Sequence, residues 1–212
     1  MQPDAHAQPR RRGRRPAGDD TRGAILAAAR EEFATRGYDG ATFRGIARAA
    51  GVDPRLVHHY FTGKEEVFAS AMELPVQPAQ LVARVVGPGV DGIGERLVRS
   101  FFGAWDGPEG RPVITALLRT AVGDGPSTTM LRQFLTDAVV RPLTRALPGD
   151  DPELRATLAV SQMVGVAMMR YVLHMEPVAS ATVDDLVPML APVVQTHLTG
   201  PTPPLHRTAP RE

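Results

Sequence analysis

Residues 42–61, which read TFRGIARAAGVDPRLVHHYF, carry the clearest local signals in the chain. A threonine can cap a helix over 43–50, where apolar residues recur at helical spacing. Gly51 opens a three-residue turn, and Asp53 and Pro54 then take the N-cap and the first position of a second helix. Two short helices joined by a tight, glycine-containing turn form a helix-turn-helix arrangement.

The flanking residues supply the supporting helices. A helix is predicted over 21–36, with Asp20 as its cap, an apolar stripe along one face and Gly37 as a left-handed stop. After the motif, Thr62-Gly63-Lys64-Glu65 has the pattern of a capping box and starts a fourth helix that reaches about Leu74. We expect this fourth helix to join the two parts of the molecule.

Proline and glycine punctuate the rest of the chain into helices, and no segment shows the sustained alternation of a strand. The predicted helices span 78–86, 91–105, 110–122, 126–147, 152–174 and 183–198. Pro188 and Pro192 should kink the last of them. The fold class is therefore all-α.

Four parts follow from this organisation. They are a disordered basic arm over 1–18, a helix-turn-helix DNA-binding domain over 19–79, a larger helical-bundle domain over 80–200, and a disordered tail over 201–212.

The composition narrows the function. Hydrophobic residues make up 43% of the 212, so a large core is possible. There is no cysteine, which excludes disulfides, thiolate metal sites and a cysteine nucleophile and fits a cytoplasmic protein. No apolar run approaches the roughly 18 residues of a membrane span. The motifs of hydrolases, zinc proteases and nucleotide-binding enzymes are missing. We expect no enzyme activity, no cofactor, no metal and no membrane partner.

The net charge is only +1, but it is unevenly distributed. Residues 9–16 hold five arginines and no acidic residue: Arg10, Arg11, Arg12, Arg14 and Arg15. Such an arm can enter the minor groove beside the reading helix. The alternative is a tail that only improves solubility.

Residues 30–72, REEFATRGYDGATFRGIARAAGVDPRLVHHYFTGKEEVFASAM, resemble the TetR family of transcriptional regulators. The matching elements are F-x-x-x-G-Y-x-x-x-T, I-A-x-x-A-G-V, H-Y-F and K-E-x-x-F, in order and at fixed distances. The resemblance covers about residues 19–79 and rests on helix number and length beyond residue 80. It implies that the helical-bundle domain over 80–200 serves ligand binding and dimerisation. It implies a homodimer that binds a palindromic operator in double-stranded DNA and is released by a small apolar or amphipathic ligand, which makes it a repressor.

The resemblance and the helix geometry together point to the DNA contacts. Arg55 can donate twice to guanine, Leu56 can cover a thymine methyl, and Lys64 has the position of a phosphate ligand in the family. The candidates are Thr42, Arg44, Pro54, Arg55, Leu56, His58, His59, Tyr60 and Lys64, with Arg11, Arg12, Arg14 and Arg15 from the arm. Asp53 is read as a cap only, and Tyr60 has a core position as its alternative. The third helix starts with Asp-Pro-Arg-Leu where the family often has small residues, so no operator sequence carries over.

Aromatic, methionine and embedded polar residues are candidates for the ligand pocket: Phe101, Trp105, Arg119, Phe134, Gln162 and Met163. Most of the apolar ones could be simple core, and Arg119 and Gln162 could be surface residues or members of a buried ion pair. The segments 152–174 and 183–198 are too apolar for one chain to cover, so we expect a four-helix interface with a second copy. Its candidates are Ala159, Ser161, Gly165, Leu186, Leu190 and Val194.

Two further functions are weighed against a ligand-released repressor. A regulator of the same fold could lack a small-molecule ligand and act as an activator or under the control of a protein partner; a fully packed C-terminal core would favour it. A ligand carrier that does not bind DNA would leave the arm and the turn without a role.

Overall fold

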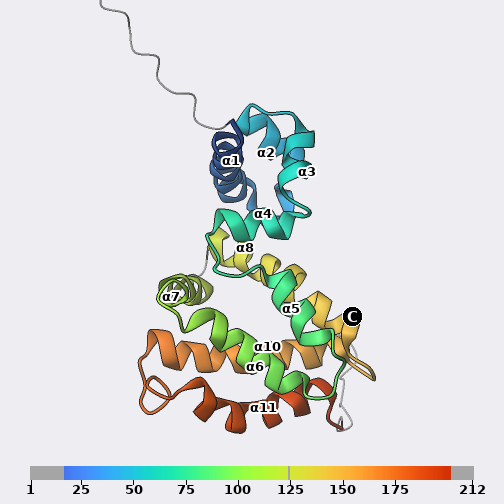
Figure 1. Cartoon of the computed structure of the whole chain (residues 1–212), viewed down its shortest axis with the longest axis vertical. Helices are drawn as coiled ribbons and strands as arrows, with labels where there is room; N and C mark the ends of the chain where they lie inside the picture. Colours follow the sequence, from blue (N-terminus) through green and yellow to red (C-terminus); the bar gives the residue numbers. More distant parts are fainter. Residues whose placement is uncertain (1–16, 124, 202–212) are drawn as a thin grey trace, which may run out of the picture.

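A computed structural model describes residues 17–123 and 125–201, and within these ranges the chain forms helices and connecting turns without a strand. The α-helices are α1 (Ala17–Gly40), α2 (Phe43–Ala50), α3 (Pro54–Tyr60), α4 (Lys64–Ala71), α5 (Pro78–Val86), α6 (Ile93–Trp105), α7 (Gly110–Ala121), α8 (Pro126–Leu135), α9 (Arg141–Ala146), α10 (Pro152–Ala167) and α11 (Val183–Thr199). Helices α1 to α4 lie at one end of the elongated molecule, and α6, α10 and α11 lie at the other (Figure 1). The all-α expectation is confirmed.

The first helix is longer than predicted. It begins at Ala17, so Asp20 lies inside it and does not cap it, which corrects the expected start at residue 21. At the other end the backbone of Gly37 leaves helical geometry with φ of 70°. A positive φ is readily adopted only by glycine, so the stop occurs where the sequence predicts it.

The longest predicted helices each contain one wider turn. A π-helical turn, Thr136–Val140, separates α8 from α9, and a second, Met168–Val172, follows α10. The remaining boundaries in the C-terminal part agree with the expectation within two residues. Pro188 and Pro192 lie inside a single helix, on its exposed side. On that side the carbonyls that lose their N–H donors face away from the core, which reduces the cost of the prolines.

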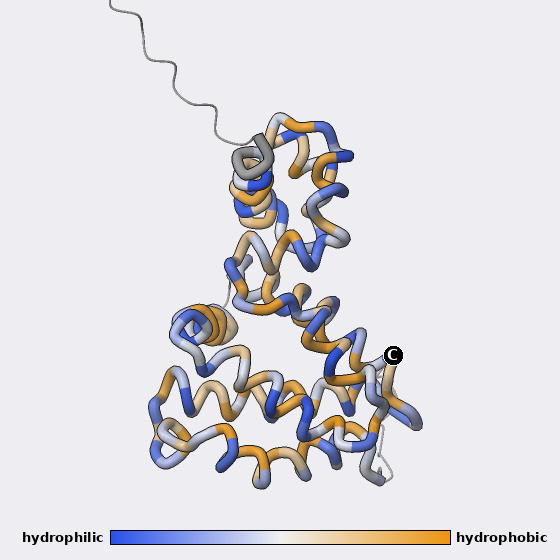
Figure 2. The backbone as a smooth tube through the Cα atoms, viewed as in Figure 1, coloured by the Kyte–Doolittle hydropathy of each residue, from blue (hydrophilic) through white to orange (hydrophobic). Residues whose placement is uncertain are grey.

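Helix α11 packs along α6 and covers it from the end of the molecule farthest from α1. Gly94 makes this approach possible, because a Cβ there would overlap the carbonyl of Ala191. Gln195 joins the two helices by accepting from the Gly94 N–H at 2.9 Å and donating to the Val90 carbonyl at 3.0 Å. Hydrophobic stretches recur along α11 at this end (Figure 2).

Two hydrophobic cores lie one above the other. The first joins α1 to α4, and the second joins α5, α6, α7, α9, α10 and α11. Helix α8 and the π-helical turn after it belong to the first, because Leu131, Phe134 and Ala138 are buried among the residues of α1 and α4. The larger domain therefore inserts one of its helices into the core formed by α1 to α4.

Candidate nucleic-acid interface and ligand cavity

Side-chain caps hold the two short helices of the motif. The Thr42 hydroxyl accepts from the Gly45 N–H at 3.0 Å, and the Asp53 carboxylate accepts from the Arg55 N–H at 2.7 Å. Between them Gly51 closes α2 with φ of 68°, in the left-handed region. The turn is thus determined by residues next to it in the sequence, and Asp53 has the capping contact that was expected.

The third helix separates its apolar and exposed faces. Val57 and the following Phe61 are buried, whereas Arg55, His58 and His59 are exposed. Leu56 is 39% exposed, so its side chain is accessible beside Arg55 at the start of the helix.

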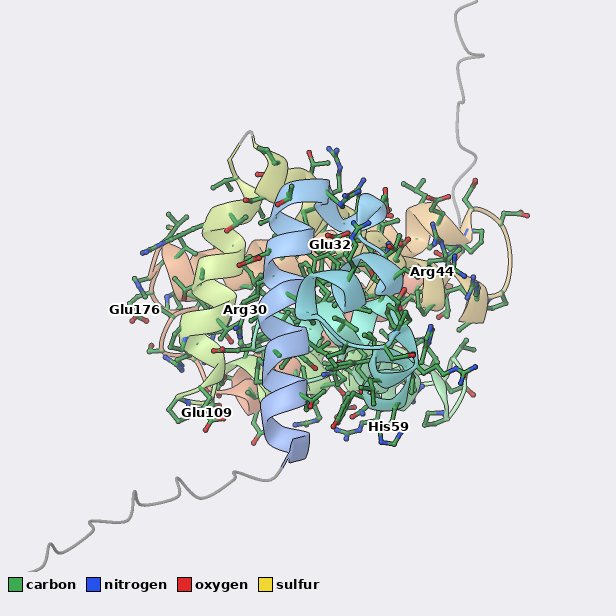
Figure 3. All side chains as sticks on the ribbon, turned by 90° about the horizontal axis from the view of Figure 1, so that it is seen from above. Arg30, Glu32, Arg44, His59, Glu109 and Glu176 are labelled. Carbon is green, nitrogen blue, oxygen red and sulfur yellow. The ribbon has the colours of Figure 1, made fainter. Side chains whose placement is uncertain are left out.

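Aromatic contacts orient the two histidines. The His58 ring lies against Phe43 with 4.6 Å between centroids, and His59 lies edge-on to Tyr60 at 5.3 Å. Arg44 and His59 lie on the side of α1 occupied by α2 and α3 (Figure 3). The exposed candidates of the motif are therefore gathered on one side of the DNA-binding domain.

Lys64 has partners within the protein. Its ammonium donates to the carbonyls of Tyr38 at 2.9 Å and Asp39 at 3.4 Å, and it lies 4.6 Å from the centre of the Tyr38 ring. Burial raises the pKa of the Tyr38 hydroxyl, with Glu65 adding to the effect, so this tyrosine stays neutral under the lysine. A phosphate bound by Lys64 would share the ammonium with the end of α1.

The start of α4 differs from the predicted capping box. Gly63 is the N-cap, and Thr62 donates from both its N–H (2.8 Å) and its hydroxyl (2.7 Å) to the carboxylate of Glu66. The predicted partner was Glu65, one residue earlier. The structure therefore corrects the predicted capping box. Because the Thr62 N–H donates to Glu66, it is not free to bind another acceptor.

Sequence reasoning missed one cation beside this surface. The guanidinium of Arg22, an exposed residue of α1, lies 5.4 Å from the centre of the Phe61 ring at the end of α3. Only the fold brings residues 22 and 61 together, so no local pattern could have identified it. Arg11, Arg12, Arg14 and Arg15 lie outside the described residues, as do the predicted arm up to residue 16 and the tail from residue 202.

The larger domain encloses a cavity of about 140 Å³ whose lining residues are all apolar. It is lined by Leu74, Val76, Pro78, Leu81, Leu97, Phe101, Trp105, Ile114, Leu117, Leu118, Ala121, Leu131, Phe134, Leu135, Val139, Val160, Met163 and Val164. Four of the six predicted pocket residues, Phe101, Trp105, Phe134 and Met163, are among them. Arg119 is exposed and Gln162 is half-buried outside the lining, so neither predicted polar contact is present.

The predicted dimer residues lie on two different sides of their helices. Ala159, Leu186 and Val194 are buried within the protomer and cannot meet a second copy directly, which corrects that part of the prediction. Ser161 and Gly165 are exposed, and Leu190 is half-buried. We define the apolar strip as the exposed large hydrophobic residues of this end of the molecule, namely Leu154, Leu158, Met169, Leu173, Met175, Met189 and Val193.

Among the described residues no helix is long and apolar enough to cross a membrane. The same part of the chain holds no cluster of three histidine or acidic side chains suited to a metal ion.

Two family models match the chain. One, described as bacterial regulatory proteins of the tetR family, matches residues 25–71. The other, described as a tetracyclin repressor-like C-terminal domain, matches residues 91–198, which is more than half of the chain.

Individual proteins match as well. A TetR-family regulator of known structure from Streptomyces coelicolor A3 is 41% identical, covering 88% of this chain and 98% of that chain, with a TM-score of 0.47. NalD of Pseudomonas aeruginosa, the secondary repressor of the MexAB-OprM multidrug efflux pump, is 20% identical over 85% of this chain and 96% of that chain, with a TM-score of 0.46. The HTH-type transcriptional activator FasR of Mycolicibacterium smegmatis is 38% identical over 63 residues, which are 30% of this chain and 29% of that protein.

Proposed function

The chain belongs to the TetR family of DNA-binding transcriptional regulators, and on that premise we propose that it is a homodimeric repressor that leaves a palindromic operator when a small ligand enters its cavity. The proposal rests mainly on Phe134, which lines the cavity and is also buried in the core of the DNA-binding domain. Whatever displaces this ring acts on both domains at once.

The DNA contacts proposed for the operator follow from exposure and chemistry. Arg55 and Leu56 reach the base edges from the start of α3, as guanidinium and methyl groups do in the major groove. Arg44, His58 and His59 extend the same surface, with Thr42, Pro54, Tyr60 and Lys64 at its margins. Arg22 joins this set as a phosphate ligand. The arm arginines would add contacts that do not depend on the sequence.

The dimer is proposed to form through the apolar strip. Leu158 on α10 and Met189 on α11 are exposed, Met189 to 74%, and the strip unites residues of both helices. A second copy of the same two helices would cover it in a four-helix arrangement with two-fold symmetry. That symmetry would place two reading helices on adjacent major grooves, about 34–36 Å apart.

In this proposal, two sets of contacts couple the lining of the cavity to the DNA-binding domain. The Phe134 ring lies 4.3 Å from Phe68 of α4 and 5.7 Å from Tyr38 of α1, centroid to centroid. Arg30 of α1 donates to the Ala71 carbonyl at 2.7 Å and pairs with Glu73 at 2.8 Å, next to the segment that lines the cavity through Leu74. We therefore propose that helix α8, together with α4, transmits a change in the cavity to the DNA-binding domain.

The cavity volume supports release through a change of shape. Pockets for drug-sized ligands enclose about 300–1,000 Å³, more than twice the volume present. A larger ligand must therefore push the lining apart, including Phe134. To move a population from 1:99 to 99:1 it must prefer the expanded state by roughly 5.5 kcal/mol.

A regulator without a ligand, acting as an activator or through a protein partner, is the second candidate. The match to an activator over 63 residues favours activation as the sign of control. The apolar cavity favours a ligand, because a domain controlled only by a partner could be fully packed. Transcription from the selected operator with and without the protein separates repression from activation.

The reading helix is tested on operator fragments selected from genomic DNA with the wild-type protein. Arg55→Ala should lower affinity for the selected operator about ten- to a hundredfold and change affinity for random DNA little, because one base contact is worth about 1–3 kcal/mol. Arg145→Ala, an exposed arginine of α9, is the matched control and should bind normally. Normal operator binding by Arg55→Ala would contradict the proposed reading helix.

The dimer is tested by sedimentation of the purified protein. Leu158→Glu should give a folded monomer, because a charge on the strip would be buried without a partner in the dimer. Val122→Glu changes an equally apolar and more exposed residue of another surface and should stay dimeric. If both variants sediment as dimers, the strip is not the interface.

A further inference from the structure

A groove of about 460 Å³ lies between the segment that links α4 to α5, helix α5 and helix α6. Leu74, Pro75, Val76, Gln77, Gln80, Leu81 and Arg84 line one side, and Arg99, Ser100, Gly103 and Ala104 line the other. Two arginines and no acidic residue contribute to this lining. The groove therefore combines positive charge with neutral hydrogen-bonding groups.

The two arginines differ in how they are held. Arg99 pairs with Glu95 at 2.7 Å and with Asp184 at 2.8 Å, and these hydrogen bonds raise its pKa. Arg84, in contrast, has no hydrogen bond or ion pair to any other residue in the described part of the chain. Its five N–H donors and its charge are thus available to a ligand, whereas the charge of Arg99 is already matched by the carboxylates of Glu95 and Asp184.

The groove adjoins the apolar cavity. Leu74, Val76 and Leu81 line both, so these three side chains form the wall between the two spaces. The cavity resembles in volume a known apolar cavity of about 150 Å³ that takes benzene, so it holds about six carbon atoms. One molecule placed across the wall would meet only apolar atoms at one end and arginines at the other.

We propose that the ligand of this regulator is an amphipathic anion, with a hydrocarbon tail of about six carbons in the cavity and a carboxylate or phosphate head on Arg84. This inference rests on the proposed function and names the ligand class of the same site. Insertion of the tail displaces the wall formed by Leu74, Val76 and Leu81. That wall follows directly on Glu73, which Arg30 ties to α1.

The test measures binding directly, by titration calorimetry on the full chain without DNA. Hexanoate, pentanol and pentylamine present the same five-carbon tail with a negative, a neutral and a positive head at pH 7, and acetate presents the head alone. Hexanoate should bind at least tenfold more tightly than each of the other three, because only it satisfies both the cavity and the arginine. The preference should shrink as salt is added.

Matched variants test the contact with the head group separately from the contact with the tail. Arg84→Ala should reduce the preference for hexanoate over pentanol to near unity, and Arg84→Lys should retain most of it. Arg119→Ala removes an exposed arginine of α7 outside both spaces and should bind hexanoate as the wild type does. Val160→Phe should weaken hexanoate by filling the cavity, and Val164→Leu, a smaller change, replaces it if the melting temperature shows that Val160→Phe is unfolded.

Operator release is measured in parallel, so that the two proposals fail separately. Tight hexanoate binding without release contradicts the ligand-released repressor and leaves the ligand class standing. Release by pentanol or pentylamine, equal binding of acetate, or no hexanoate binding by the folded protein overturns the anion proposal and leaves the repressor standing.

Discussion

The two domains fill their interiors in different ways. In the DNA-binding domain the rings of Phe33, Tyr38, Phe68 and Phe134 interlock, with Phe33 and Phe68 meeting edge to face at 5.0 Å. In the larger domain the helices leave a cavity that only apolar side chains line. A close-packed core holds a reading surface in one shape, whereas a cavity leaves several shapes close in energy. The difference teaches that one fold can combine a closely packed domain with a domain that contains an apolar cavity.

The ring shared by the two cores gives the largest expected effect. Phe134→Ala should lower the free energy of unfolding by about 4 kcal/mol, since it removes a buried ring and joins a new void to the cavity. Phe101→Ala, which removes a half-buried ring that lines only the cavity, should cost clearly less. Urea denaturation compares them; equal losses would mean that the two cores do not differ as described.

The larger domain contains an ion pair between Arg170 and Asp106, in which the Arg170 side chain is buried. Asp106 accepts from Arg170 at 2.9 and 3.0 Å and from the Tyr171 hydroxyl at 2.9 Å, and the Arg170 side chain is only 4% exposed. Asp106→Ala should cost about 3 kcal/mol, because it leaves a buried guanidinium unpaired.

The control for this pair is Asp184→Ala, which breaks the exposed pair with Arg99 and should change stability by less than about 1 kcal/mol. Both losses are read from urea denaturation. Similar values for the two variants would show that burial of Arg170 has no energetic weight.

At two glycines of the DNA-binding domain, the same substitution to alanine should change the free energy of unfolding in opposite directions. Gly51→Ala should destabilise by about 1 kcal/mol, because an alanine at φ of 68° is strained even where space is free. Gly23→Ala, in helix α1 with open space around it, should stabilise by roughly 0.5–1 kcal/mol. Thermal melting measures both, and a stabilising Gly51→Ala would show that the turn is not held as described.

The smallest effect concerns the cap of α11. Thr182 donates to Asp185 from its N–H at 2.9 Å and from its hydroxyl at 2.6 Å, and these bonds lower the pKa of the carboxyl group. The stabilisation is therefore fully present above the unfolded pKa of about 3.9 and is lost as the pH falls through the lower folded value. Asp185→Asn should make stability depend less on pH in this range, which thermal melting between about pH 2 and 5 measures. If the variant lost stability toward low pH as the wild type does, the capping role of Asp185 would be contradicted.

The sequence predicted the motif accurately because its signals are local. Thr42, Gly51 and Asp53 each act on backbone groups within a few residues, so their contacts could be expected from the order of residues alone. Predictions that needed a partner distant in the chain were less accurate. The acceptor of Lys64 lies 26 residues away, and the inner side of α11 became known only from its packing on α6.

By itself the amino-acid order determined an all-helical chain, the helix-turn-helix and nearly every helix end, since caps, turn glycines and the spacing of apolar residues depend on near neighbours. Tertiary packing alone decided which apolar side chains line the cavity, which form the strip, and that Arg84 and not Arg119 lines the neighbouring groove. The physical reason is that the periodicity of one helix shows that it has an apolar side, but what that side meets depends on how all the helices pack together.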